Sequence, residues 1–271
     1  MKKILPVVIV ALLVNVAWSL DFDPFQGPKP IAILIQTDPW RMVIDSDTPM
    51  TAIYDDGRVV YLKREKTDGS SYVSKRLTTE ELGAVELKLA SFGDFSKLKR
   101  GYNLAPNVTD QPETKIYLNL GNKEFVTTVY GLKMSPTELP THPDFRGEPK
   151  PDELPVPIRQ VHEYLRTLDY KDSTPWESPY VEVIIWAYEY APAQSIQWPK
   201  DWPGLRSPNT LKRGGSYSIF LPSKELPRLR DFLKTRKEKG AVEIDGKKWA
   251  VSVRFAFPSE PVWINAFRKR E

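Results

Sequence analysis

The chain has 271 residues, with 39 Lys and Arg against 35 Asp and Glu, 25 Pro, 2 His and no Cys. The absence of cysteine excludes disulfides, cysteine-ligated zinc, iron–sulfur clusters and a thiol nucleophile. Two histidines exclude any site that needs three from one chain. A formal charge of +4, with both signs dispersed along the chain, gives no indication of a nucleic-acid partner.

The beginning of the chain has the pattern of an export signal. Two lysines precede an apolar run over residues 4–14, and Ala17 and Ser19 supply the small residues that a cleavage site requires. We therefore expect a signal peptide over residues 1–19 and an extracytoplasmic location, in the periplasm or outside the cell. The alternative is an uncleaved N-terminal anchor, although the apolar run is shorter than the ~20 residues that a membrane span needs.

Strand pairs joined by tight-turn residues are the next clear signal. Asp-Gly and Gly-Asn steps favour hairpins because these residues adopt the positive φ angles of tight turns. Hairpins are predicted over residues 50–63, 115–130 and 241–255. The longer apolar segment Tyr180–Tyr190 is predicted to be a central strand.

Apolar residues at helical spacing predict helices over Thr78–Phe92, Val156–Leu168 and Ser223–Arg236. Thr78 or Thr79 is placed to cap the first of these helices, because threonine hydroxyls accept hydrogen bonds from the free backbone N–H groups of a first turn. Ser223 is expected to cap the helix that it begins. Pro157 is acceptable in the second helix because the first turn needs no donor there.

These elements favour an α+β fold of antiparallel sheets in two halves, each covered by one helix. The helix entries Leu77–Leu82 and Leu221–Leu226, each followed by a Gly-turned hairpin, are consistent with a degenerate internal duplication of a β-β-α-β-β unit. Caps and turns that use the same residues would produce the same similarity, so both interpretations stay open. We expect an N-terminal half over residues 20–170, with a Pro-rich connection at 135–157, and a C-terminal half over 171–271.

Catalytic signatures are missing from the sequence. It has no nucleophile elbow, no phosphate-binding loop, no dinucleotide fingerprint, no zinc-protease motif and no complete calcium loop. We therefore predict no metal, no cofactor and no assigned catalytic residue. Paired carboxylates are the one device that the chain could hold. Glu182 and Glu189 have an odd spacing along one strand and point to opposite faces, so either would need a distant carboxylate as its partner.

Aromatic residues gather at the start of the C-terminal half. Trp198 and Trp202 lie in a loop stiffened by Pro and Gly, and Trp176 lies earlier in the same stretch. Exposed rings on a rigid loop suit stacking on sugars or anchoring of a protein partner, so these three are the candidate binding residues. In the alternative arrangement the rings fold back over the sheet edge. Trp186, within a predicted strand, is expected in the core.

Three segments, together with the export signal, carry a resemblance. They are the hairpin Tyr54–Val60, the helix entry Leu77–Leu82 and the hairpin Thr114–Leu132. With them the chain loosely resembles uncharacterised secreted bacterial proteins of unknown function, over about half of the mature chain. These motifs are mostly turn and cap chemistry. The resemblance implies a secreted protein and no particular activity or functional residue.

We expect an exported, non-catalytic binding or interaction protein whose partner is a protein or a glycan. The first alternative is a carboxylate-dependent hydrolase of cell-wall or extracellular polymer, and the second is a structural envelope protein. Whether the chain is an enzyme stays open. No nucleic-acid partner is expected, and a membrane is contacted only through an uncleaved N-terminal segment.

Overall fold

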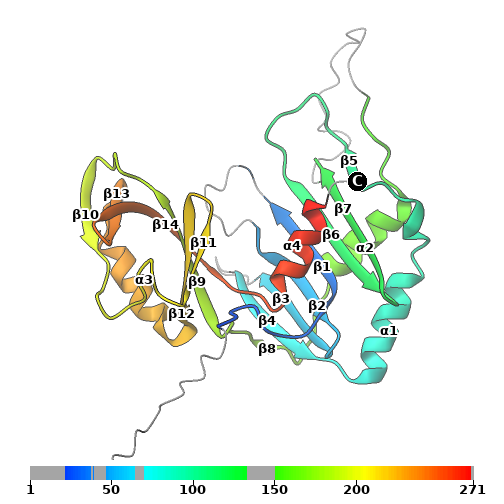
Figure 1. Cartoon of the computed structure of the whole chain (residues 1–271). Helices are drawn as coiled ribbons and strands as arrows, with labels where there is room; N and C mark the ends of the chain where they lie inside the picture. The colour runs from blue at the N-terminus through cyan, green and yellow to red at the C-terminus, as the bar shows by residue number, and fades with distance from the viewer. Residues whose placement is uncertain (1–21, 38, 40–46, 65–69, 133–149, 270–271) are drawn as a thin grey trace, which may run out of the picture.

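The computed structural model describes residues 22–37, 39, 47–64, 70–132 and 150–269. The predicted signal peptide and residues 135–149 of the Pro-rich connection lie outside the described residues. Figure 1 shows two sheets side by side, with α3 against the second sheet on the left and α1, α2 and α4 around the first sheet on the right. The α+β class expected from the sequence is confirmed.

The first sheet has eight strands within the described residues, in the order β5-β7-β6-β1-β2-β3-β4-β8. Their bounds are β1 (Pro30–Thr37), β2 (Pro49–Tyr54), β3 (Arg58–Arg64), β4 (Ser70–Arg76), β5 (Gly101–Asn103), β6 (Glu113–Leu120), β7 (Lys123–Tyr130) and β8 (Thr174–Pro175). The central strand β1 pairs antiparallel with β2 and β6. Strand β1 was not predicted, although its continuous apolar run is typical of a strand buried on both faces.

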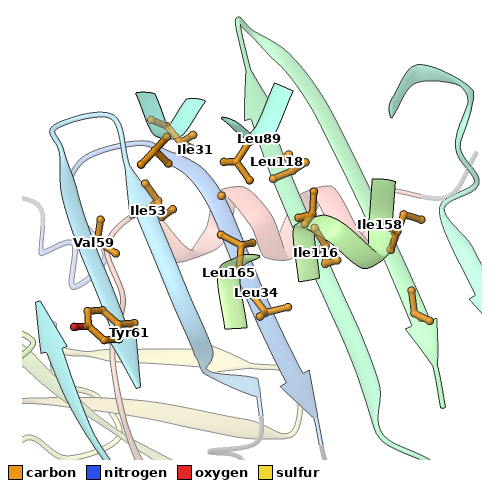
Figure 2. Packing of buried hydrophobic residues seen from close by; sticks show 14 of the residues in the cluster. Ile31, Leu34, Ile53, Val59, Tyr61, Leu89, Ile116, Leu118, Ile158 and Leu165 are labelled. Carbon is orange, nitrogen blue, oxygen red and sulfur yellow. The ribbon is translucent and has the colours of Figure 1, made fainter. Parts of the chain in front are cut away.

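Helices cover both faces of the first sheet. On one face, α1 (Thr79–Ala90) and α2 (Val156–Arg166) bring Leu89, Ile158 and Leu165 against Leu34 and neighbouring strand residues (Figure 2). A 3₁₀ turn (Phe95–Lys97) follows α1. On the other face, α4 (Glu260–Arg268) buries Trp263 against Ile33 and its neighbours. The predicted helices over α1 and α2 are confirmed.

The second sheet has six strands among the described residues, in the order β10-β13-β14-β9-β12-β11. Their bounds are β9 (Tyr180–Ala187), β10 (Ala193–Gln197), β11 (Thr210–Arg213), β12 (Ser216–Pro222), β13 (Gly240–Ile244) and β14 (Lys247–Phe255). As predicted, β9 is central, and it lies between β12 and β14. One face is covered by α3 (Leu226–Lys234), whose Leu229 is fully buried.

The third predicted helix begins later than expected. A 3₁₀ turn occupies Ser223–Glu225, and α3 follows it without a side-chain cap. The Ser223 hydroxyl donates to the backbone carbonyl of Ser178 instead. Ser223 therefore ties the helix entry to the segment before β9 and does not cap the helix.

The three predicted hairpins are confirmed as β2–β3, β6–β7 and β13–β14. Gly121 and Asn122 have φ angles of 57° and 63°, and Asp245 and Gly246 have φ angles of 50° and 73°. Positive φ at two successive residues is the geometry of the turn that matches the twist of antiparallel strands. Local turn chemistry therefore determines where these strands reverse.

Each sheet has a central strand with antiparallel neighbours on both sides, one of them from the hairpin that follows a covering helix. The sheets differ in which hairpin strand is inner, the first strand (β6) in one and the second (β14) in the other. The internal duplication therefore stays a prediction. The predicted boundary at residue 170 places β8 and α4 in the C-terminal half, whereas both contact the first sheet.

A capping box at the start of α1 allows the predicted helix cap at Thr78 to be tested. The Thr78 hydroxyl accepts from the backbone N–H of Glu81 at 3.2 Å, and the Glu81 carboxylate accepts from the backbone N–H of Thr78 at 2.8 Å. We expect Thr78→Ala to lower the free energy of unfolding by about 1 kcal/mol in urea titrations, because the backbone N–H of Glu81 loses its acceptor. Thr79→Ala, one residue further on, is the control. Equal losses in the two variants would contradict the cap assignment.

Candidate functional site

The structure places the candidate residues Trp198 and Trp202 in the core. They are only 8% and 6% exposed, their ring centroids are 4.9 Å apart, and both rings pack edge-on against Phe232 of α3. Their indole N–H groups donate to the carbonyl of Pro203 and to the carboxylate of Glu225. The expectation of an exposed aromatic loop is therefore corrected. The stiff loop folds back over the apolar face of the second sheet, which is the alternative that the sequence left open.

Trp176 is also buried, in a cluster between the two sheets. Its ring lies 4.8 Å from that of Phe257 and 5.8 Å from that of Tyr72, measured between centroids. Phe257 follows the second sheet, and Tyr72 belongs to β4 of the first. Trp176 therefore joins the sheets and offers no exposed ring to a ligand.

The prediction that Trp186 lies in the core is wrong, because its side chain is 36% exposed. Alternation along β9 explains the error. Val183 and Ile185 point towards α3, whereas Glu182, Ile184 and Trp186 point to the other side of the sheet. We call this other side the junction face, since Glu182 on it lies next to groups from the first sheet.

The junction face consists of three rows of directly paired residues on β12, β9 and β14. The rows are Ser216–Trp186–Ala250, then Ser218–Ile184–Ser252, then Phe220–Glu182–Arg254. Successive rows are about 7 Å apart, because two residues of a strand span that distance. The first row is accessible to solvent at Trp186, and the last row is buried.

A cluster of charged groups occupies the last row and connects the two sheets. The guanidinium of Arg254 contacts Glu182 at 2.6 Å, Asp47 at 3.3 Å and, most closely, Glu260. Arg213 of β11 contacts the other oxygen of Glu182 at 2.9 Å. Asp47 precedes β2 and Glu260 begins α4, so both acids come from elements of the first sheet. Three carboxylates face two guanidinium groups, which leaves one excess negative charge.

Burial controls the ionisation of this cluster. Removal from water raises the pKa of Glu260, the charges of Glu182 and Asp47 raise it further, and Arg254 acts in the opposite direction. Burial disfavours the charged form of Arg254, but the nearby Glu260 and Glu182 outweigh that effect and raise its pKa. Arg254 therefore remains cationic and requires carboxylate partners in the folded chain.

The sequence left open whether Glu182 or Glu189 meets a distant carboxylate, and the cluster shows that Glu182 does. Glu189 is exposed beyond the end of β9, whereas Glu182 meets the distant acids Glu260 and Asp47 through Arg254. Both carboxylate oxygens of Glu182 are ion-paired and the side chain is fully buried. A general acid or base must reach a proton of the substrate. The observed arrangement suits cohesion between the sheets and does not suit proton transfer.

Other parts of the described chain offer less chemistry. A shallow pocket of about 680 Å³ lies at one end of the first sheet, where Thr37, Asn103, Glu113 and Tyr130 contribute to its lining. The Tyr130 hydroxyl there is used internally, since it accepts from the backbone of Gln111 and donates to that of Val108. Among the residues that the structure places, no group of three acids or histidines could hold a metal ion, and no helix has the length and apolarity to cross a membrane.

Removal of the central guanidinium should be strongly destabilising. We expect Arg254→Met to lower the free energy of unfolding by about 3–5 kcal/mol, because Glu260 would be left buried without its cationic partner and Glu182 would keep only Arg213. The control is Lys234→Met, since Lys234 pairs with Asp231 in solvent and such pairs contribute about 0–1 kcal/mol. Urea titrations followed by tryptophan fluorescence measure both. Arg254→Lys, which keeps the charge, should fall between them, and a loss for Arg254→Met no larger than the control's would contradict a cohesive role.

The raised pKa of Glu260 determines the sign of a pH effect. Above the ordinary value of 4.5 the folded chain holds a proton that the unfolded chain has released. This contribution to the free energy of unfolding is fully present below 4.5 and is lost as the pH rises through the raised pKa of the folded state. We therefore expect the stability difference between wild type and Glu260→Gln to decline from acid to neutral pH.

Urea titrations across this pH range measure that difference. Glu163→Gln is the control, because the exposed Glu163 has its pKa lowered by its hydrogen bond to Arg166. Glu163 makes a small contribution to the free energy of unfolding that is present above the ordinary glutamate pKa and is lost as the pH falls. Its pH dependence is therefore opposite in sign to that of Glu260. A difference for Glu260→Gln that grew with pH would overturn the assignment of a raised pKa.

Comparisons with known proteins identify no relative. No family model matches the chain, and no curated protein and no solved structure matches it. The function is therefore inferred from the chemistry of the chain itself. Among the described residues, the exposed aromatic end of β9 carries that inference.

Proposed function

We propose that this protein is an exported, non-catalytic binding protein that binds a glycan through an aromatic strip at the end of β9. The strip consists of Trp186, Tyr188 and Tyr190. Trp186 is 36% exposed and Tyr190 is 83% exposed, and the rings of Tyr188 and Tyr190 pack edge-to-face at 5.4 Å. The exposure of these rings within five residues of the chain is the observation that carries the proposal, and the N-terminal signal pattern supports export.

Small neighbours leave part of the Trp186 side chain exposed. Its directly paired residues on either side are Ser216 and Ala250. The adjacent turn is formed by Gly214 and Gly215, and a side chain added at either glycine would meet nothing within 4 Å. The indole is therefore partly open to solvent, and this open part can contact a flat partner.

The strip is also held in place by the backbone. The N–H of Tyr188 donates to the carbonyl of Lys248 at 3.0 Å, and the N–H of Ala191 donates to the carbonyl of Tyr188 at 3.2 Å. The first bond continues the pairing of β9 with β14 beyond the last residue of the strand, and the second closes a turn over residues 188–191. A preorganised surface loses little conformational entropy on binding, which favours affinity.

Aromatic rings with polar tips suit a carbohydrate. The apolar faces of Trp186 and the tyrosines can stack on the C–H face of a sugar ring, while the indole N–H and phenol O–H groups remain available for hydrogen bonds to hydroxyls. The described structure supports binding without catalysis, because the acids that meet at Glu182 are held by arginines.

The test uses the mature chain (residues 20–271) in affinity electrophoresis through gels containing β-glucan, xylan, dextran or polygalacturonate. We expect Trp186→Ala and Tyr190→Ala to weaken binding at least about tenfold, because each removes an aromatic anchor. Leu87→Ala is the control, since Leu87 is an exposed apolar residue on α1 of the first sheet. If the wild type binds a polysaccharide and both strip variants bind it as tightly as the wild type does, the strip is not the binding surface.

A further inference from the structure

Positive charge is concentrated around α3. Residues 222–239, which comprise this helix and the turns at its two ends, contain 7 Lys and Arg against 3 Asp and Glu. Their net charge of +4 equals the formal net charge of the whole chain. The rest of the chain is therefore neutral overall, and the excess charge of the protein lies in this one segment.

The charge that is left unpaired in this segment is mostly positive. Of its three acids, Glu225 pairs with Arg228 and Asp231 pairs with Lys234, so Glu238 is the acid that has no cation partner in the described structure. Four exposed cations form no ion pair within the described part of the chain, namely Lys224, Arg230, Lys237 and Lys239. The helix dipole accounts for cations at the end of α3, but it does not account for Lys224 before the helix or Arg230 in its middle.

Helix α3 presents this charge on an outer side of the molecule. Its residues Leu226, Leu229 and Leu233 pack on the second sheet, on the side opposite to the junction face that contacts the first sheet. Among the described residues, the large apolar side chains that are exposed include none from residues 222–239. The segment therefore offers a partner positive charge and no apolar anchor.

Such a surface suits anionic lipid better than a charged sugar chain. The nearest rings cannot stack on a sugar, because Trp202 is only 6% exposed, Phe232 packs edge-on against it, and Arg228 lies 4.8 Å above its centroid. Anionic headgroups form a continuous negative surface that attracts clustered lysines and arginines. Because lipids diffuse within the bilayer, they can gather opposite each cation without a pocket of fixed shape.

We propose that residues 222–239 form a basic face that binds the surface of a membrane containing anionic phospholipids. The contact is electrostatic and peripheral, with the cations next to headgroup phosphates. From the sequence alone, a membrane contact is expected only at an uncleaved N-terminal segment, and the folded chain adds this second one. The inference goes beyond the proposed function and does not depend on it. Trp186 points to the side of the sheet opposite α3, so the aromatic strip stays accessible in the bound state.

The test is co-sedimentation of the mature chain (residues 20–271) with sucrose-loaded vesicles of equal parts phosphatidylcholine and phosphatidylglycerol. The mature chain lacks the apolar run of residues 4–14, so only its folded part can bind. We expect Lys224→Gln/Arg230→Gln/Lys237→Gln to weaken binding at least about tenfold, because each cation near an anionic surface strengthens binding by about fivefold.

The matched control is Lys97→Gln/Lys123→Gln/Arg159→Gln, which should bind as the wild type does. These three cations are exposed on elements of the first sheet and its helices and form no ion pair within the described chain, and their replacement lowers the net charge equally. Equal losses of binding in the two triple variants would show that net charge alone matters and would overturn the basic face. Absence of wild-type binding to the mixed vesicles also overturns it.

Further outcomes identify the partner. Raising the salt from about 0.1 M to about 1 M should release the protein, because the screening length falls from about 10 Å to about 3 Å. Equal binding to vesicles of phosphatidylcholine alone contradicts an electrostatic contact. If the α3 variant binds vesicles normally but is no longer retarded in polygalacturonate gels, the partner is a soluble polyanion and the lipid proposal is wrong. Trp186→Ala should bind vesicles as the wild type does, so that failure of either proposal is recognised separately.

Discussion

The guanidinium of Arg254 is the point at which the two sheets become one structure. It cannot lose its proton in the interior, so the fold must supply it with carboxylates. Those carboxylates come from β9, from the segment before β2 and from the first residue of α4. Their convergence fixes how the second sheet faces the first, and thereby which side of β9 becomes the junction face.

Sequence reasoning succeeded where the signal was local. The hairpins followed from residues that accept positive φ, and α1 followed from an apolar stripe with the cap residue Thr78. It failed for β1, because a continuous apolar run has no period, and a short run of that kind also fits a buried helix. It missed α4 as well. That helix is only nine residues long, and its position depends on packing of Trp263 against a sheet that is distant in the sequence.

In the candidate site, too, local features were predictable and features that depend on distant packing were not. The aromatic-rich stretch was evident from the sequence. Which of its side chains are exposed depends on the face of the sheet that α3 covers. Side chains alternate between the two faces of a strand. Because Val183 and Ile185 point to the face that α3 covers, Trp186 lies on the opposite face. For Trp198 and Trp202, Pro and Gly indicated a stiff loop but not the direction of its packing. The Arg254 cluster could not be predicted from the sequence, since Asp47 lies 207 residues before Arg254 and the members form no motif.

The return of α4 to the first sheet has a consequence for the order in which the protein is made. One face of that sheet, including Ile33 and Tyr117, is buried against residues that are synthesised last. The N-terminal two-thirds of the chain therefore emerges from the ribosome with an uncovered apolar surface, and it cannot complete its core until Trp263 has been added. A chain built in this way delays its final folding until synthesis is nearly finished. Such a delay is compatible with the proposed export, in which a polypeptide crosses a membrane before it becomes compact.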